Sequence, residues 1–346
     1  MSKLGIYVNR QTLSSSEQIT AVVKCRDAAE KMGHTVEFIF PVDMKKIPKL
    51  DALFIRANTD PMNTTYVAAR MAEMYGIPVI DDPASIRICA DKINMYMHLM
   101  RKKVAMPETR FLKKKELEEA QAAALFKELG SPLVLKEPST SFSARVEKVA
   151  SVEELLKVAR RFFKLSDWIV VQEYIESRFD WRIGVIGSQL LYACRYIIPS
   201  ETFKIQASVN GHVVYCDVES VPADQVPPEV IELGLQAGNA VGKGLYGVDI
   251  KESKGKLYVI EVNDNPSLEG GEDAHYPDMF ANIISYLMKG DVCGYAESLS
   301  QAATNQLGLD GGLNLESGPA MCGPSSLDED LAEDEVCSYK IDFSER

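Results

Sequence analysis

Gly247-Val-Asp-Ile-Lys251 and Leu257-Tyr-Val-Ile-Glu-Val-Asn-Asp-Asn-Pro266 are two apolar runs that flank a short polar stretch around Gly255. Two such runs joined by a glycine-containing turn predict a β-hairpin. Asp249 and Glu261 lie at equal distances from Gly255, so a symmetric hairpin brings these two carboxylates opposite each other.

Because side chains alternate along a strand, Asn263 shares a face with Glu261. Facing carboxylates repel, and a hard dication such as Mg²⁺ that bridges phosphate oxygens removes this penalty. The hairpin therefore predicts a metal site made by Asp249, Glu261 and Asn263. The alternative is a pair of exposed acids on an ordinary hairpin.

Leu133-Val-Leu-Lys136 ends an apolar strand on a lysine, and a half-buried ammonium group requires an anionic partner. The small-residue segment from Ser139 to Arg145 follows and is suited to closing over phosphates. An ordinary loop beside a salt-bridged lysine is the alternative for this segment alone.

Val170-Val-Gln-Glu-Tyr-Ile175 indicates a strand that leaves into a linker, whose backbone suits an adenine edge while Glu173 suits a ribose hydroxyl. Arg182 and Arg195 lie on neighbouring strands of a second predicted hairpin, where guanidinium groups would stabilise a transferring phosphoryl group. Surface arginines on a sheet are the alternative.

Composition indicates a globular protein of two or three structural units, since 46% of the 346 residues are hydrophobic and 25% are charged. The net charge is -12, but residues 291–346 carry twelve acidic and two basic residues, which leaves the body close to neutral. This distribution predicts no nucleic-acid partner. The absence of a long apolar run and of a leader-like start predicts a soluble, cytoplasmic protein that needs no membrane.

Neither cysteines nor histidines indicate a site. The seven cysteines lack CxxC spacing, which favours reduced thiols over a disulfide framework or a zinc site. The four histidines have no metal-ligand spacing.

The chain divides by pattern into an α/β part and an α+β part. Residues 1–83 alternate strand and helix patterns, with strands expected at 4–8, 35–40, 52–55 and 77–80. One helix is expected to start at an N-cap among Ser14 to Ser16 and run to Met32, and another is expected at 64–75. One helix is expected over 84–103. Strand pairs mixed with helices follow, with hairpin turns at Gly187-Ser188 and Asn210-Gly211.

The last 55 residues are acidic and without periodicity, which predicts disorder. A tethered substrate or docking peptide around Cys322 and Cys337 is the alternative. Deletion of residues 296–346 separates the two, because only the tether makes turnover depend on the tail.

Several of these motifs together resemble RimK-like ATP-grasp ligases, over about residues 80–290. The resemblance is carried by Asp91-Lys92, Leu-Lys136, Gln-Glu-Tyr-Ile175, Phe179-Asp-Trp-Arg-Ile-Gly184, Val-Asp249 and Glu-Val-Asn263-Asp-Asn-Pro266. It implies an ATP-grasp fold, with a pre-ATP-grasp α/β domain (1–83), two α+β subdomains that close on ATP (84–172 and 173–290) and the acidic tail (291–346).

The resemblance also implies roles for individual residues. Lys92 and Lys136 would hold phosphates, the segment Glu173, Tyr174 and Ile175 would frame the base and ribose, and Asp180 would contact the nucleotide. Arg182 and Arg195 would face the γ-phosphate. Asp249, Glu261 and Asn263 would bind Mg²⁺, with Mn²⁺ as an alternative.

Three departures from the family pattern lie near the acceptor side. Where the family has Arg-Ser-Asn after a phenylalanine, this chain has Phe203-Lys-Ile-Gln206, so Lys204 and Gln206 would meet phosphate with altered geometry. A serine-rich segment replaces a glycine-rich loop. The segment Ser267-Leu-Glu-Gly-Gly-Glu-Asp-Ala-His-Tyr276 is unusually acidic.

The implied reaction activates a carboxylate as an acyl phosphate and transfers it to an amine, with glutamate suggested by the family. Its partners are ATP, the carboxylate and the amine, and a homo-oligomer stays open. The alternatives are a non-catalytic nucleotide-binding module that regulates a partner and a phosphotransferase that stops at a phosphorylated product.

Overall fold

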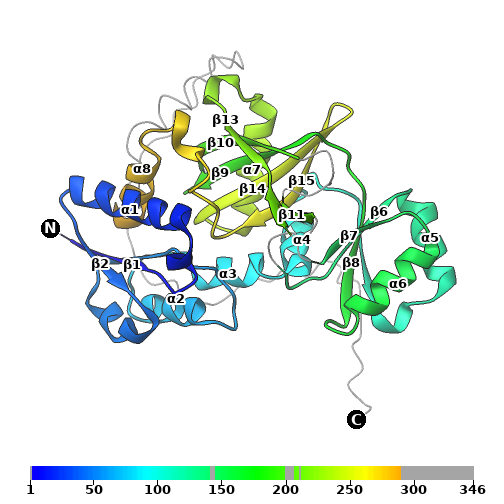
Figure 1. The fold of residues 1–346 in the computed structure, drawn as a ribbon, viewed down its shortest axis with the longest axis horizontal. Coiled ribbons are helices and arrows are strands. Elements are labelled where there is room, and N and C mark those ends of the chain that lie inside the picture. The colour runs from blue at the N-terminus through cyan, green and yellow to red at the C-terminus, as the bar shows by residue number, and fades with distance from the viewer. Residues whose placement is uncertain (1, 141–144, 199–205, 210–211, 290–346) are drawn as a thin grey trace, which may run out of the picture. The chain divides into compact units, whose positions relative to one another are not determined.

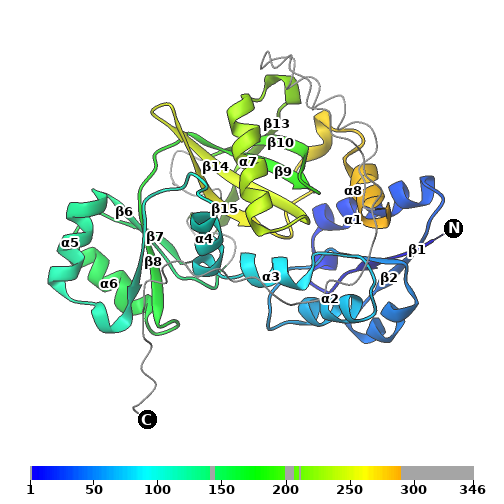
Figure 2. The same cartoon turned by 180° about the vertical axis from the view of Figure 1, so that it is seen from behind.

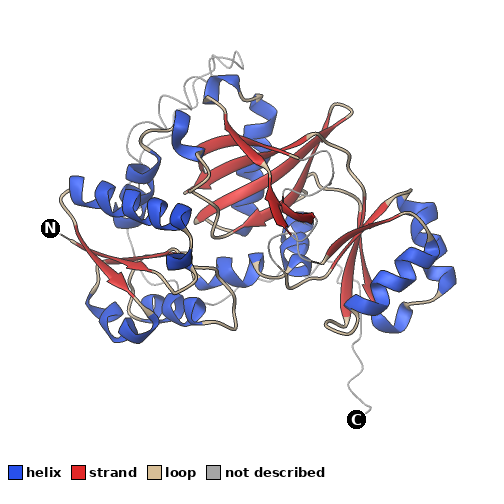
Figure 3. Cartoon of the chain, in the orientation of Figure 1, coloured by secondary structure: helices blue, strands red, loops and turns tan. Residues whose placement is uncertain are grey.

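A computed structural model describes residues 2–140, 145–198, 206–209 and 212–289, and for residues 206–209 and 212–215 it describes the backbone alone. The predicted disordered tail lies outside these residues. Figures 1 and 2 show the elements from two sides, and Figure 3 shows helices and strands in different colours.

The N-terminal part is a parallel four-stranded sheet in the order β2-β1-β3-β4, as the alternating pattern predicts. Helix α1 begins after Ser15, whose side chain accepts a hydrogen bond from Gln18 N, and α2 is capped in the same way by Asn63. The elements are β1 (Lys3–Tyr7), η1 (Thr12–Ser14), α1 (Ser16–Lys31), β2 (Thr35–Ile39), η2 (Pro41–Lys49), β3 (Ala52–Ile55), α2 (Thr64–Met74) and β4 (Val79–Ile80).

Two helices replace the single helix expected over 84–103, which corrects that prediction. They are α3 (Pro83–Cys89) and α4 (Lys92–Arg101). Between them Asp91 has an extended backbone, and its side chain accepts a hydrogen bond from Asn94 N, so it starts a new helix. Lys92 therefore lies in the first turn of α4.

A four-stranded antiparallel sheet follows, in the order β5-β8-β6-β7. Helices α5 and α6 cover one face of it (Figure 1). The edge strand β5 was not predicted, because charged residues interrupt its short run. The elements are β5 (Thr109–Lys113), η3 (Lys114–Glu116), α5 (Glu119–Leu129), β6 (Leu133–Lys136), β7 (Val146–Val149), α6 (Val152–Phe162) and β8 (Trp168–Glu173).

The largest sheet has five antiparallel strands in the order β13-β10-β9-β14-β15. The hairpins predicted at Gly187-Ser188 and Asn210-Gly211 correspond to two antiparallel pairs, β9 with β10 and β11 with β12, and the second pair is a separate two-stranded sheet. The elements are β9 (Phe179–Ile186), β10 (Gln189–Ile197), β11 (Gln206–Val209), β12 (His212–Tyr215), β13 (Asp217–Ser220), η4 (Ala223–Gln225), α7 (Pro228–Val241), β14 (Leu245–Ser253), β15 (Lys256–Asn263), η5 (Glu272–His275) and α8 (Met279–Lys289).

The buried apolar side chains of the described residues form separate clusters. One cluster of buried side chains extends from the N-terminal sheet to both faces of the five-stranded sheet, and α8 returns to lie beside α1 (Figures 1 and 2). The sheet β5-β8-β6-β7 has a separate cluster with its own helices. A unit with its own core can move relative to its neighbour.

Candidate active site

A pocket lies between the sheet β5-β8-β6-β7 and the five-stranded sheet. Eight of the thirteen predicted site residues line it. They come from α4, β6, the end of β8, β9 and the β14–β15 hairpin. The eight are Lys92, Lys136, Glu173, Tyr174, Ile175, Asp180, Asp249 and Glu261. Segments distant in the sequence thus converge on one cavity.

The β14–β15 hairpin brings Asp249 opposite Glu261, which confirms the geometric prediction. The pairing depends on a bulge. Ile250 pairs with Val259 and Asp249 with Glu261, so Ile260 is the extra residue on β15. Without this bulge Asp249 would oppose Ile260, and Glu261 would point to the other face.

Asp249 is also the partner of Arg182 from β9, and both side chains are buried. Arg182 Nε donates to Asp249 Oδ1 at 2.5 Å and Nη2 donates to Oδ2 at 3.0 Å. Asn263 Nδ2 approaches the same Oδ2 at 3.3 Å. Burial raises the pKa of Asp249 to about 6, although Arg182 opposes the rise.

Glu261 and the two predicted lysines form the opposite side of the charge cluster. Lys92 Nζ lies 3.1 Å from Glu261 Oε1. Burial favours a higher pKa for Glu261, but Lys92 and Lys136 outweigh it and hold the pKa below its usual value. This carboxylate is therefore ionised at neutral pH.

Lys136 is buried at the end of β6, where its Nζ donates to Tyr96 OH at 2.6 Å. Burial lowers the pKa of Lys136 to about 7, against the attraction of Glu261. The ammonium form of Lys136 needs nearby negative charge, and Glu261 offsets only part of the cost of burial.

Lys251 also lines the pocket, although no role was predicted for it from the sequence. It pairs in register with Asp180 across β14 and β9, and its Nζ contacts the Asp180 carboxylate. Burial raises the pKa of Asp180, and Lys251 opposes the rise. The interruption of an apolar strand by a lysine, already used for Lys136, is the pattern that predicts such a residue.

The expected linker follows β8 and forms one wall of the pocket. Glu173 ends the strand and accepts a hydrogen bond from Glu108 N at 3.0 Å. Ile175 is buried, and Lys148 Nζ lies 4.6 Å from the centre of the Tyr174 ring. The wall therefore combines apolar surface with a carboxylate at its edge.

Arg195 does not join the cluster, so the expectation that both arginines meet in the site is wrong for this residue. Arg195 pairs with Trp181 in the β9–β10 register, while Arg182 pairs with Cys194. Adjacent residues of a strand point to opposite faces. The Arg195 guanidinium accordingly packs 4.6 Å from the Trp181 ring.

Two predicted residues fall where the structure gives little or nothing. Lys204 lies outside the described residues, and Gln206 is described only as the first backbone position of β11. Their expected contact with phosphate stays a prediction.

Buried charges next to the metal motif were missed by sequence analysis. Arg56 directly follows β3, Asp81 follows β4 and Asp264 follows β15, and all three are at least nine-tenths buried. Burial raises the pKa of Asp264 to about 7 and raises that of Asp81 as well. The sequence pattern that could have found them is a charged residue at the end of an apolar strand.

The described residues lack two kinds of feature, a membrane-crossing helix and a cluster of three or more His, Cys, Asp or Glu side chains placed to hold a metal ion. No helix there combines the length and the apolarity that a membrane crossing needs. No three His, Cys, Asp or Glu residues there are grouped as metal ligands.

Comparison with known proteins bears on the same region. A family model described as a RimK-like ATP-grasp domain matches residues 89–287. A probable alpha-L-glutamate ligase 1 from Shewanella frigidimarina is 27% identical over 296 residues, which cover 80% of this chain and 94% of the relative. A probable alpha-L-glutamate ligase 2 from Pseudoalteromonas atlantica is 24% identical over 295 residues, 80% of this chain and 94% of the relative.

Solved structures of similar fold are more distant in sequence. D-alanine–D-alanine ligase from Bacillus anthracis, complexed with ATP, has a TM-score of 0.62 at 18% identity and covers 88% of this chain and all of its own. A RimK domain ATP-grasp protein from Sphaerobacter thermophilus has a TM-score of 0.60 at 19% identity, over 85% of this chain and all of its own. These two similarities support the fold.

Proposed function

Because the chain belongs to the RimK-like ATP-grasp family, we propose that it is an ADP-forming ligase that joins a carboxylate to an amine. The observation that carries the proposal is one pocket in which the Asp249–Glu261 pair of the hairpin faces Lys92 and Lys136. We also propose that residues 84–172 and 173–290 are the two subdomains that close on ATP.

The hairpin residues fit a divalent cation. Two carboxylates lie opposite each other, and burial raises the pKa of Asp249 to about 6 even beside Arg182, so a further cation would stabilise its charged form. Asp249, Glu261 and Asn263 would hold Mg²⁺, or Mn²⁺, through oxygen atoms. When bound, the ion neutralises charge on the phosphate oxygens.

The pocket walls fit the two ends of ATP. Glu173, Tyr174 and Ile175 offer a backbone edge, a ring and a carboxylate to the adenosine, while Lys92, Lys136 and Lys251 offer positive charge to the triphosphate. Lys251 is an addition to the predicted set. Asp180 holds Lys251 and so contributes through that lysine.

In the proposed reaction a substrate carboxylate oxygen attacks the γ-phosphorus of ATP, and the bond to the ADP oxygen breaks. Lys136 and Arg182 offset the negative charge that gathers on the phosphoryl oxygens. The amine then attacks the acyl phosphate, phosphate leaves, and the amine loses a proton to give the amide. Arg182 is held by Asp249 through two contacts, so its charge is fixed before the reaction begins.

Glutamate is the first substrate to test, because both curated relatives described above are named probable alpha-L-glutamate ligases. It would serve as the carboxylate or the amine, with a peptide, a protein terminus or a metabolite as the other partner. The cytoplasm supplies ATP and free amino acids, and we propose it as the compartment.

A screen for ADP release tests the proposal directly. The purified protein is mixed with Mg²⁺, ATP and pairs drawn from amino acids and short peptides, and the product is identified by mass spectrometry. We expect one pair to give equal amounts of ADP and amide. A phosphorylated product without amide would instead indicate a phosphotransferase.

Three variants separate the site from the rest of the hairpin. Asp249→Asn and Glu261→Gln should lower ADP release by about a hundredfold or more, in line with the loss of groups that position phosphoryl transfer. Glu252→Gln is the matched control, because Glu252 is an exposed carboxylate on β14. Full activity in D249N and E261Q would contradict the proposal.

A further inference from the structure

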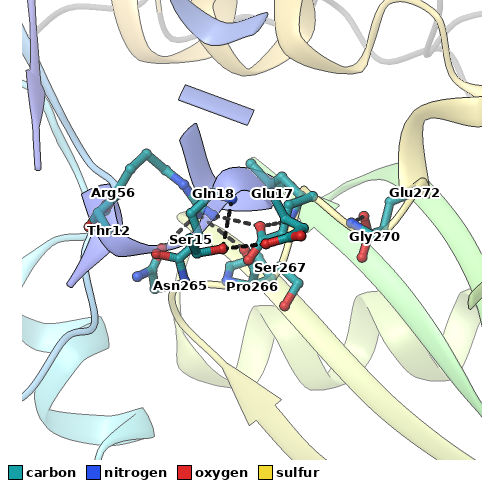
Figure 4. A network of polar contacts seen from close by, with 12 residues as sticks. Thr12, Ser15, Glu17, Gln18, Arg56, Asn265, Pro266, Ser267, Gly270 and Glu272 are labelled. Carbon is teal, nitrogen blue, oxygen red and sulfur yellow. Dashed lines mark hydrogen bonds and ion pairs between the residues drawn. The ribbon is translucent and has the colours of Figure 1, made fainter. Parts of the chain in front are cut away.

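The acidic segment that departs from the family pattern, residues 267–276, contains a glutamate that the protein encloses completely. Glu272 lies at the start of η5 and its side chain is fully buried. Figure 4 shows it with Gly270 at one end of the loop after β15, while Pro266 at the other end accepts a hydrogen bond from Arg56. The proposed reaction gives the Glu272 carboxylate no role.

The local sequence Gly270-Gly-Glu272 surrounds this carboxylate with backbone. Gly271 has a φ angle of 97°, in the left-handed region that favours glycine, and the resulting turn brings Gly270 N to Glu272 Oε2 at 2.6 Å. A Cβ built on Gly270 would lie 3.0 Å from Glu272 Oε1, so a side chain there would crowd the carboxylate. The two glycines therefore hold the Glu272 side chain in one position.

The second carboxylate oxygen of Glu272 contacts the five-stranded sheet. The buried Tyr196 of β10 donates its hydroxyl hydrogen to Glu272 Oε1 at 3.0 Å. Ser220 Oγ of the neighbouring strand β13 donates to the Glu272 carbonyl at 3.2 Å, so the backbone is attached to the same sheet. Two neutral donors, a hydroxyl and an amide, thus bind the two carboxylate oxygens.

The Tyr196 ring connects Glu272 to Arg182. Arg182 pairs with Cys194 across β9 and β10, and Tyr196 lies two residues farther along β10, so Arg182 and Tyr196 are on the same face of the sheet. Arg182 Cζ lies 4.7 Å from the centre of the Tyr196 ring, where the negative face of the ring attracts a guanidinium. Because hydrogen bonds polarise the groups that they join, donation to a carboxylate makes this ring face more negative.

The ring restrains Arg182 in a way that Asp249 does not. Asp249 holds the edge of the guanidinium through two contacts, but the same carboxylate is a proposed metal ligand. An ion bound there would use the same two oxygens. Tyr196 contacts the face of the guanidinium, so its hold on Arg182 does not compete with the ion.

We propose that Glu272 is a positioning residue that acts on Arg182 through Tyr196. This inference rests on the proposed ligase function, in which Arg182 offsets charge on the transferring phosphoryl group. Glu272 fixes the plane and the charge of the ring, and the ring fixes the guanidinium before the reaction begins. Since Arg182 acts on charge that develops in the transition state, loss of Glu272 should lower turnover more than nucleotide affinity.

Nuclear magnetic resonance of the nucleotide-free, full-length protein labelled with ¹⁵N-arginine tests the inference without turnover. The Nε–H signal of Arg182 is identified by its loss in Arg182→Lys, and its position depends on the nearby Tyr196 ring. We expect the signal to shift in Glu272→Gln, because glutamine has one acceptor oxygen for two donors. It should also shift in Tyr196→Phe, which keeps the ring and removes the hydroxyl.

Asp273→Asn and Tyr276→Phe are the matched controls, because they loosen the same segment at other points. Asp273 pairs with Lys24 of α1 at 2.5 Å, and Tyr276 OH donates to the Val221 carbonyl at 2.7 Å. Both variants should leave the signal of the arginine in place. If E272Q does not fold, Y196F decides alone.

ADP release and calorimetric titration with AMP-PNP and Mg²⁺ measure the consequence for the reaction. E272Q and Y196F should each lower turnover by about tenfold and change nucleotide affinity by less than about threefold. If Glu272 acts through Tyr196, the double variant should also lose about tenfold, whereas independent effects would multiply to about a hundredfold.

Four outcomes would overturn this role of Glu272. They are an Arg182 signal that stays in place in both variants, a control that moves the signal as far, turnover losses that multiply, and a nucleotide affinity that falls as far as turnover. Ligase turnover together with any of these leaves the proposed function standing. A shifted Arg182 signal, without ADP release from any substrate pair in the unaltered protein, overturns the proposed function instead.

Discussion

At the scale of the residue, the candidate site is a set of opposite charges that pair with one another across elements. Arg182 pairs with Asp249, Lys92 with Glu261 and Lys251 with Asp180. Such pairs keep charged groups in fixed positions inside a buried pocket. A metal–triphosphate complex carries both signs of charge and can exchange partners with this network.

The residue types in the sequence predicted most of these charged residues. The alternation of side chains along each strand determines on which face of the sheet the others lie. Arg182 and Arg195 are equivalent as motif residues, yet only Arg182 lies on the face of the sheet that carries Asp249, because the β9–β10 register pairs Arg195 with Trp181. Register depends on turn geometry and on the bulge in β10, which composition does not reveal. Arg56 was missed because its partners lie more than two hundred positions away.

The lowered pKa of Lys136 leads to a prediction about protons. At pH 8 a pKa of about 7 leaves this lysine mostly neutral, and a bound triphosphate favours its charged form. Binding of AMP-PNP with Mg²⁺ at pH 8 should therefore be accompanied by proton uptake at Lys136, of at most one proton. Calorimetry in buffers of different ionisation enthalpy measures this uptake.

Lys136→Arg should bind nucleotide with no uptake at this position, because a guanidinium stays charged at pH 8. Lys256→Arg, at an exposed lysine of β15, is the control and should behave as the unaltered protein. Equal proton uptake in K136R and the unaltered protein would exclude Lys136 as the source.

Burial of Lys136 also makes stability depend on pH. The unfolded chain keeps this pKa near 10.5, while in the folded protein it is about 7, so the unfolded state binds more protons between these values. The contribution of Lys136 to the free energy of unfolding of the nucleotide-free protein should therefore rise as the pH increases from about 7 to about 10.5. Urea unfolding of the unaltered protein and K136M across this range isolates the contribution.

At the scale of the element, the β14–β15 hairpin places two demands on its sequence. Its turn needs residues that tolerate positive φ angles, and its base needs a residue without a side chain. The turn residues Lys254 and Gly255 have φ angles of 51° and 71°, in the left-handed region that favours glycine. At the base, Gly247 leaves room for Pro266 and Arg182. The sequence predicted the turn from glycine, but the bulge at Ile260 and the close packing at Gly247 depend on the neighbouring strands.

Two glycine variants of this hairpin should separate stability from activity. Gly255→Ala strains the turn far from the site and should lower the free energy of unfolding by about 1 kcal/mol with little change in turnover. Gly247→Ala should lower turnover by about tenfold or more, because its Cβ displaces Arg182 or Pro266. Urea unfolding and ADP release measure both effects, and a G247A protein with full turnover would show that this packing does not position Arg182.

At the scale of the whole molecule, the alternation of strands and helices predicted an α/β layer followed by an α+β region, and the described residues have this arrangement. Individual boundaries were less predictable. A capping residue divided one expected helix at Asp91, and a short edge strand at Thr109–Lys113 escaped notice because it carries charges. Both features depend on backbone N–H and C=O groups that lack partners at a helix start or at a sheet edge, and the positions of these groups are set by the neighbouring elements.

The proposed nucleotide pocket exists because two sheets with different cores face each other. One sheet supplies Lys136 and the linker, and the other supplies Asp249 and Glu261. Two units with separate cores can approach each other as ligand binds between them. In the proposed reaction one bound complex must therefore touch both sheets at once.

Anomalous diffraction from crystals grown with Mn²⁺ and AMP-PNP measures this directly. We expect a manganese peak bound by Asp249, Glu261 and Asn263, with the triphosphate between that ion and Lys92 and Lys136. Nucleotide bound in the pocket with the manganese peak on other residues, or nucleotide bound away from both sheets, would contradict this expectation.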